Sequence, residues 1–151
     1  MKRQLFLMIV SLVLLLPVTG KAGGAYTPRR GSEIRKAILD GLRIEVKKMS
    51  GMDAIFVIDH LKTHNGWAWV EAQPRSKDGK SGLENISALL HRSADGRWCT
   101  VLIPSYECVN ADDPDKACQK EDRMIFHNLT SFPLNVPADI FPTSFTKQEK
   151  R

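Results

Sequence analysis

The chain has 151 residues, of which 42% are hydrophobic and 26% are charged. These fractions are typical of one globular domain, and they exclude a collagen-like, disordered or polytopic membrane protein. The formal net charge is +5, but residues 1–22 hold three of the basic residues and no acidic one, so the remainder carries only +2. Such a small excess does not indicate a nucleic-acid-binding domain.

Residues 1–22 have the three-part pattern of a secretory signal peptide. A basic start precedes an apolar run over 5–18, which is shorter than the roughly 20 residues that a membrane-spanning helix needs. Cleavage after Ala22 is the favoured prediction. Cleavage after Gly24 fits nearly as well, because Ala22 then stands three residues before the cut. An uncleaved membrane anchor is the less favoured alternative.

The rest of the chain is expected to form one exported domain, in the periplasm or outside the cell. The predicted domain covers 23–146, and 147–151 are expected to be a disordered tail. No later apolar run is long enough to cross a bilayer, so no membrane insertion is expected after cleavage.

An amphipathic helix is predicted over 32–49. Its apolar residues recur every three or four positions, which is the period of one helical face: Ile34, Ile38, Leu42, Val46 and Met49. Ser32 is a suitable N-cap, and Gly51 suits the left-handed conformation that ends many helices. Gly41 lies beside the apolar face and permits close packing.

After the helix the apolar period changes to two, which predicts four strands, over 54–61, 67–72, 85–92 and 98–103. Asn65-Gly66 and Asp95-Gly96 predict tight turns, because their residues tolerate a positive φ. The stretch 73–82 is predicted to be a loop. Beyond Pro104 the pattern is less regular: a polar loop over 108–118, a strand or short helix over 121–129, and an irregular apolar tail.

One long helix followed by an antiparallel meander predicts an α+β fold, in which the helix covers one apolar face of a curved sheet of about four strands. The simplest closed arrangement wraps that sheet around the helix. Cystatin-like and NTF2-like domains have this architecture.

Several short stretches of the sequence form a pattern that resembles small, uncharacterised exported bacterial proteins. The N-terminal part of the resemblance is Tyr26-Thr27-Pro28-Arg29-Arg30-Gly31-Ser32, followed by 35–40 and Leu42-Arg43. Trp67-Ala68 and Gly96-Arg97-Trp98 match a later pair and turn. The resemblance covers about 26–103 and implies export and a cystatin-like or NTF2-like domain, with no activity to carry over.

Three cysteines in an oxidising compartment predict one disulfide and one free thiol. Cys108 and Cys118 flank the polar loop, so we predict that they are bonded to each other and that Cys99, in an apolar strand, is free and buried. A Cys99–Cys108 bond is the alternative if the chain reverses at Pro104. Catalysis by Cys99 is not favoured.

Familiar catalytic and metal-binding motifs are absent, so no cofactor or metal is predicted. Asp59, His60 and His64 are candidates for a metal or acid–base cluster. On one regular strand, however, the two histidines lie roughly 13 Å apart, which is too far for one metal ion. The acidic residues Asp112, Asp113 and Asp115 lack the spacing of a calcium loop. Surface roles are therefore favoured for both groups.

Trp67 and Trp69 alternate on one side of the second predicted strand. Paired aromatic residues on a sheet make a good contact surface for a ligand or partner. Packing in the core against the predicted helix is the favoured interpretation, and a binding surface is the alternative.

Two functions are compatible with the sequence. The leading hypothesis is a non-catalytic exported binding protein that contacts or inhibits another periplasmic protein. The alternative is an NTF2-like small-molecule pocket protein or enzyme, with Asp59 and His60 as acid and base in a cavity above about 300 Å³ between helix and sheet.

Overall fold

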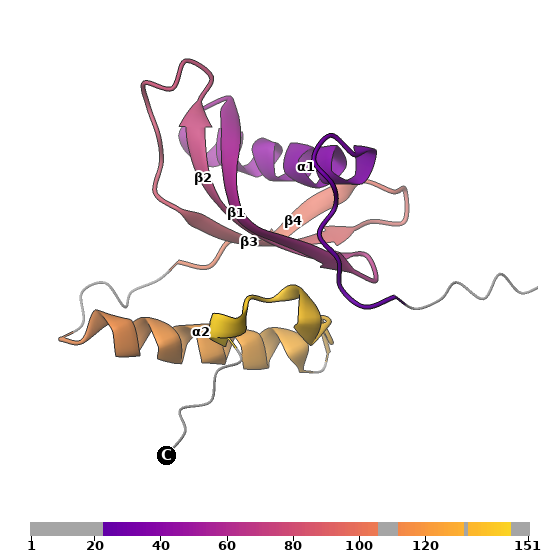
Figure 1. The fold of residues 1–151 in the computed structure, drawn as a ribbon, viewed down its shortest axis with the longest axis vertical. Coiled ribbons are helices and arrows are strands. Elements are labelled where there is room, and N and C mark those ends of the chain that lie inside the picture. Colours follow the sequence, from indigo (N-terminus) through magenta and orange to yellow (C-terminus); the bar gives the residue numbers. More distant parts are fainter. Residues whose placement is uncertain (1–22, 106–111, 132, 146–151) are drawn as a thin grey trace, which may run out of the picture.

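The computed structural model describes residues 23–105, 112–131 and 133–145. Its centre is a four-stranded antiparallel sheet in the order β1-β2-β3-β4. The strands are β1 (Ala54–His64), β2 (Trp67–Ser76), β3 (Ile86–Arg92) and β4 (Trp98–Leu102). Helix α1 (Glu33–Ser50) lies on one face, and helix α2 (Pro114–Thr130) lies on the other (Figure 1). The α+β prediction is confirmed at this level, but the sheet is open, because β1 and β4 do not pair.

Helix α1 begins and ends one residue later than the predicted bounds, 32–49, with the predicted cap residues at both ends. The hydroxyl of Ser32 accepts a hydrogen bond from the backbone N–H of Arg35, and Gly51 ends the helix with a φ of 74°. Gly41 is buried against β4, where a Cβ would lie 2.4 Å from the carbonyl oxygen of Trp98. The absence of a side chain at this position lets the helix approach the strand closely.

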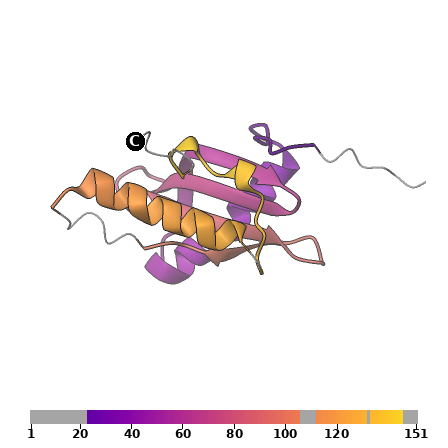
Figure 2. The same ribbon diagram turned by 90° about the horizontal axis from the view of Figure 1, so that it is seen from below.

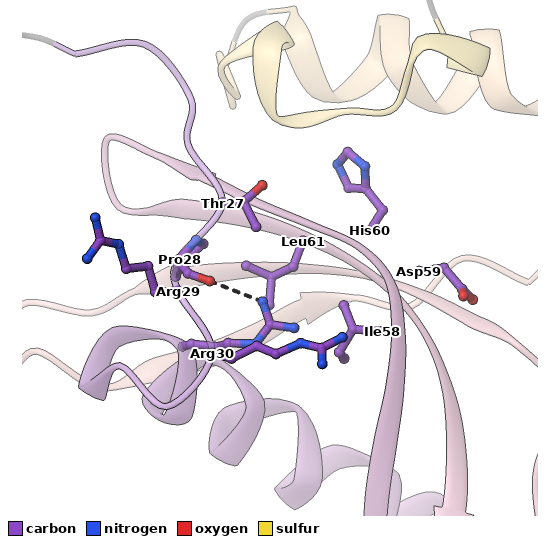
Figure 3. Close-up of a pocket in the computed structure, with 9 residues that line it drawn as sticks. Thr27, Pro28, Arg29, Arg30, Ile58, Asp59, His60 and Leu61 are labelled. Carbon is purple, nitrogen blue, oxygen red and sulfur yellow. Dashed lines mark hydrogen bonds between the residues drawn. The ribbon is translucent and has the colours of Figure 1, made fainter.

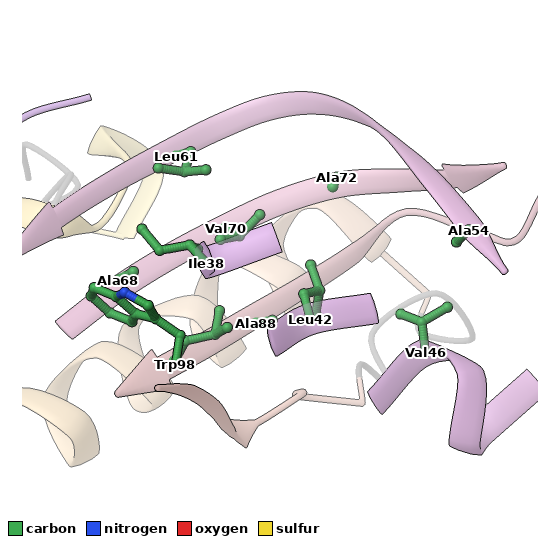
Figure 4. Packing of buried hydrophobic residues seen from close by; sticks show 11 residues of the cluster. Ile38, Leu42, Val46, Ala54, Leu61, Ala68, Val70, Ala72, Ala88 and Trp98 are labelled. Atoms are coloured by element: carbon green, nitrogen blue, oxygen red, sulfur yellow. The ribbon is translucent and has the colours of Figure 1, made fainter. Parts of the chain in front are cut away.

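The first hydrophobic cluster lies between α1 and the sheet (Figure 4). It contains the middle of the predicted helical face, and the small residues of β2 and β3 pack against it: Ile38, Leu42, Val46, Ala68, Val70, Ala72 and Ala88. Met49, which was predicted to belong to this face, is 62% exposed. Strand β4 is short, and beside Met49 there is a pocket of about 260 Å³ instead of a packed neighbour.

The two predicted tight turns are present. Asn65 and Gly66 both have a positive φ, as does Gly96. Strand β2 continues through part of the predicted loop, to Ser76, because it pairs with β1 over its whole length. Pro74 is tolerated there because β3 pairs with β2 only as far as Ala72, so the missing N–H leaves no gap in that ladder.

The other face of the sheet is covered by a second layer that the sequence did not predict. Helix α2 crosses this face, and the C-terminal segment with the short helices η2 (Ala138–Ile140) and η3 (Thr143–Phe145) lies beside it (Figure 2). Residues 121–129, for which the sequence predicts a strand or a short helix, are helical. The predicted polar loop is wrong from Pro114 onward, because Asp113 caps a helix by accepting from the N–H of Lys116.

The prediction for Cys99 is half correct. Its thiol is free, but the residue is exposed and not buried. Trp98 faces α1, so the next residue of the edge strand faces the other side of the sheet, opposite His91. We therefore expect a thiol reagent to label Cys99 in the folded protein. Cys108 lies outside the described residues, so its bond to Cys118 stays a prediction.

Residues 1–22 and 147–151 also lie outside the described part of the chain, so the signal peptide and the tail stay predictions. Among the helices that are described, none combines the length and the apolar composition needed to cross a bilayer.

Candidate functional site

The N-terminal arm, residues 25–31, builds one wall of the candidate site. Tyr26 pairs with Thr63 at the edge of β1, and the two backbone N···O distances are 3.1 and 2.9 Å. Pro28 is buried, while Arg29 and Arg30 are exposed. Pairing with β1 therefore fixes the arm in place and presents its two adjacent arginines next to the strand.

A β-bulge in β1 builds the opposite wall. The pairing register shifts between Ile58 and His60, so Asp59 has no partner on β2. Because of this extra residue, Ile58 and Leu61 both pack against the α1 cluster. The side chain of Asp59 points away from this side of the strand (Figure 3). The bulge thus supplies an apolar floor and moves the carboxylate away from it.

Between the arm, the start of α1 and the bulge there is a pocket of about 350 Å³. Three arginines contribute to its lining: Arg29 and Arg30 from the arm, and Arg35 from α1. The other lining residues are Thr27, Pro28, Ile58, Asp59, His60 and Leu61. The pocket therefore combines an apolar floor with a basic rim.

The charge of the arginines is not balanced within the described chain. Arg35 donates to the carbonyl oxygen of Pro28 at 3.1 Å, and none of the three arginines forms an ion pair with a described residue. Arg97, by contrast, forms an ion pair with Asp95 at 2.6 Å. A guanidinium stays protonated at any physiological pH, so the pocket carries permanent positive charge and suits an anionic group.

Asp59 and His60 both belong to the lining of this pocket, but their side chains do not converge in it. His60 points to the opposite side of β1 (Figure 3), where its Nε2 lies 2.8 Å from the carbonyl oxygen of Ile140. His64 Nδ1 lies 2.8 Å from Asp139 Oδ1. Within the described ranges, no three His, Cys, Asp or Glu side chains are grouped so that they could hold a metal ion. The two histidines thus contact the C-terminal segment and not each other.

Asp139 links three distant segments. Besides His64 of β1, its carboxylate accepts a hydrogen bond from the backbone N–H of Ala25 at 2.8 Å. Burial pushes the pKa of Asp139 upward, but the hydrogen bonds from His64 and Ala25 outweigh it, so the pKa lies below its ordinary value. The carboxylate therefore remains charged while it holds the arm, the sheet and η2 together.

Trp67 and Trp69 share one face of β2, as predicted. That face is covered by the second layer and not by the predicted helix, which packs on Ala68 and Val70 instead. Trp69 is fully buried and lies 4.9 Å, between ring centroids, from Phe141. Trp67 is half-buried and contacts His91 in a tilted arrangement, with ring centroids 4.3 Å apart. Trp69 has no exposed surface to offer a partner, so the binding role stays a prediction for Trp67 alone.

The acidic residues of the predicted calcium alternative belong to the start of α2. Asp113 caps the helix and forms an ion pair with Lys116 at 3.0 Å. Asp115 lies in the first turn, where a negative charge is favoured by the helix dipole. Asp113 and Asp115 therefore have structural roles at the start of α2, which explain the acidic residues here without a calcium ion.

The arginine pocket was missed by sequence reasoning. In the sequence, Arg29, Arg30 and Arg35 are noted only as part of the resemblance. The one available signal was three arginines within seven residues with a single acidic residue, Glu33, among them. The bulge at Asp59 was missed as well, because a strict period of two was assumed across 54–61, although 54–58 are all apolar and Asp59 and His60 are consecutive polar residues.

Comparisons with protein-family models, curated proteins and solved structures found no match to this chain.

Proposed function

We propose that this chain is a non-catalytic exported binding protein that recognises an acidic segment of another envelope protein through the arginine pocket. The observation that carries the proposal is the set of three arginines around one pocket, none of which has a carboxylate partner among the described residues. Three neighbouring guanidinium groups create a positive potential at this site, which attracts an anionic group.

The rim of the pocket supports a protein partner. Arg29 and Arg30 are exposed, and Tyr26, which precedes them on the arm, is 50% exposed. Arginine and tyrosine are enriched among the residues that contribute most to protein interfaces. The guanidinium groups also bind carboxylates in a bidentate geometry that a lysine cannot reproduce.

The pocket chemistry favours binding over the acid–base alternative. Its volume of about 350 Å³ exceeds the roughly 300 Å³ expected of a ligand site. However, arginine is too weak an acid to exchange protons at neutral pH. Asp59 points away from the cavity, and His60 is bonded to Ile140 on the other side of β1.

Export and a cystatin-like arrangement are part of the same proposal. Export is supported by the signal-peptide pattern of residues 1–22. The cystatin-like arrangement is supported by the order of the elements, since a long N-terminal helix is followed by a four-stranded meander that packs across it.

Peptide binding tests the proposal. A fluorescent peptide of ten glutamates is titrated with the chain at low and physiological salt, beside a peptide of ten glutamines. We expect binding of the acidic peptide only, and we expect Arg30→Gln and Arg35→Gln each to weaken it roughly tenfold, as for loss of a charged hydrogen bond. Arg97→Gln is the matched control, because that arginine is already paired with Asp95.

Two outcomes would contradict the proposal. Equal affinity of the three variants would remove the pocket from the interaction. Displacement of the peptide by millimolar phosphate or citrate, together with tighter binding of those anions than of any acidic peptide, would assign the pocket to a small anion instead. Capture of a protein from periplasmic extract by the unchanged chain, and not by Arg30→Gln, would support the protein partner.

A further inference from the structure

The backbone nitrogen of Ala25 lies at the start of the arm and is bound by a carboxylate. Its N–H donates to Asp139 Oδ2 at 2.8 Å, while Asp139 Oδ1 binds His64 at the same distance. Ala25 itself packs against the second hydrophobic cluster, on the α2 side of the sheet. A carboxylate that accepts from a neutral amide would be bound more strongly by a positively charged donor in the same place.

The sequence offers a way to create that charge. Gly24 is a suitable last residue of a signal peptide, because Ala22 then stands three positions before the cut. Hydrolysis of the Gly24–Ala25 peptide bond consumes one water: the C–N bond breaks, the hydroxyl joins the Gly24 carbonyl carbon, and the Ala25 nitrogen takes the proton. At neutral pH this nitrogen gains a second proton and becomes an ammonium group.

We propose that the signal peptide is removed after Gly24, and that the new α-ammonium of Ala25 forms an ion pair with Asp139 that fastens the N-terminal arm. The proposal rests on the export part of the proposed function. The proposed site binds the chain's own amino terminus. It is formed by Asp139 of η2, whose other carboxylate oxygen contacts His64 of β1.

A cut after Ala22 would not produce this pair. Two residues would then precede Ala25, whose nitrogen would remain a neutral amide, and the ammonium group would lie further along the exposed chain at Gly23. The attraction between exposed charges falls with distance and is screened by salt within about 10 Å. Only the cut after Gly24 places the charge on the nitrogen that Asp139 already contacts.

The ion pair would also act on the arginine pocket. Tyr26, the next residue of the arm, pairs with Thr63, and Arg29 and Arg30 follow at the pocket rim. Fastening Ala25 limits the freedom of the segment that carries these two arginines. Processing would therefore order one wall of the pocket.

The cleavage site is tested directly by the intact mass of the protein exported from cells that express the full chain. We expect a chain that begins at Ala25. A chain that begins at Gly23 overturns the proposed site while leaving export in place, and an exported chain that still begins at Met1 overturns export as well.

The ion pair is tested with chains that begin at Ala25, made from a fusion that leaves no added residue. One form keeps the free amine, and the other is acetylated, which retains the N–H but removes the charge. We expect the free amine to raise the melting temperature by about 1–4 °C at pH 7, as for an exposed ion pair in a domain of this size. The difference should shrink in 1 M salt.

Asp139→Asn is the matched variant, because it keeps an oxygen at the same place without its charge. In this variant the free and acetylated chains are expected to melt at the same temperature. A melting difference that survives Asp139→Asn, or that is absent from the unchanged chain, overturns the ion pair. Neither result depends on the pocket, so binding of the acidic peptide judges the proposed function separately.

Discussion

The two faces of the sheet are buried by different kinds of structure. Against α1 the sheet presents small and aliphatic side chains, such as Ala68 and Val70, and the helix packs closely on them. On the other face Trp69 packs in a cluster with Phe141 and Phe145, which come from the C-terminal segment. The first layer is made of consecutive elements, and the second is made by a chain that returns from far along the sequence.

This difference explains why β2 is buried on both sides. Ala68, Trp69 and Val70 are consecutive and all have no exposed surface. Small and large residues alternate along β2, and this alternation matches how far each layer lies from the sheet. The closely packed helix leaves room for alanine, whereas the irregular segment needs a large ring to fill the space.

The largest expected effect tests whether the second layer is as important as the first. Trp69→Ala should destabilise the protein by about 3–5 kcal/mol, because it removes a fully buried aromatic side chain. Leu42→Ala, its counterpart on the α1 face, should cost about 2–5 kcal/mol. Chemical denaturation followed by circular dichroism measures both. A loss below about 1 kcal/mol for Trp69→Ala would mean that the second layer contributes little to stability.

The first layer could be predicted from the sequence because its signals are local. The period of Ile38, Leu42 and Val46 gives the helix, and Asn65-Gly66 gives the first hairpin. Pro114 begins α2, but a proline within an acidic stretch also fits a loop, so the helix was not recognised. The clustering of Phe141 with Trp69 depends on a long-range return of the chain, which no periodicity reports.

The candidate site was even less predictable. The bulge at Asp59 shifts the pairing register between Ile58 and His60, which a strict period of two does not predict, and it decides which side chains face the pocket. Arg29 and Arg30 reach this pocket only because Tyr26 pairs with Thr63. That pairing joins residues far apart in the sequence. The arginines can therefore be seen in the sequence, but their position beside β1 cannot be predicted from it.

A second prediction concerns the close approach of α1 to β4, which belongs to the first layer. Gly41→Ala should destabilise the protein by about 1–3 kcal/mol, as expected for overpacking. The added Cβ meets the backbone oxygen of Trp98 at 2.4 Å, and a backbone atom cannot move aside easily. Alanine would otherwise stabilise a helix by about 1 kcal/mol relative to glycine. Lys36→Ala, on the exposed side of the helix, is the control, and a stabilised Gly41→Ala protein would contradict the close contact.

A third prediction concerns how the stability of each layer depends on pH, because Asp139 belongs only to the second layer. Its pKa is lower in the folded protein than its ordinary value of 3.8. The stabilisation is therefore complete above that ordinary value and is lost as the pH falls through the folded pKa. Asp139→Asn should melt about 1–3 °C below the unchanged chain at pH 7, and the gap should close as the pH falls below about 4. The deficit of Leu42→Ala should not depend on pH in this way.

The smallest expected effect concerns Met49, which shares the apolar face of α1 with Ile38 but is 62% exposed. Met49→Ala should change the free energy of unfolding by less than about 0.5 kcal/mol, whereas Ile38→Ala should cost about 2–5 kcal/mol. The reason is that Met49 borders an open pocket beside Val101 and Ile103, so little contact is lost on truncation. If Met49→Ala instead costs as much as Ile38→Ala, the methionine is covered in solution. Repeating both measurements over a hundredfold dilution would then show whether a second copy covers it, because stability contributed by association falls with concentration.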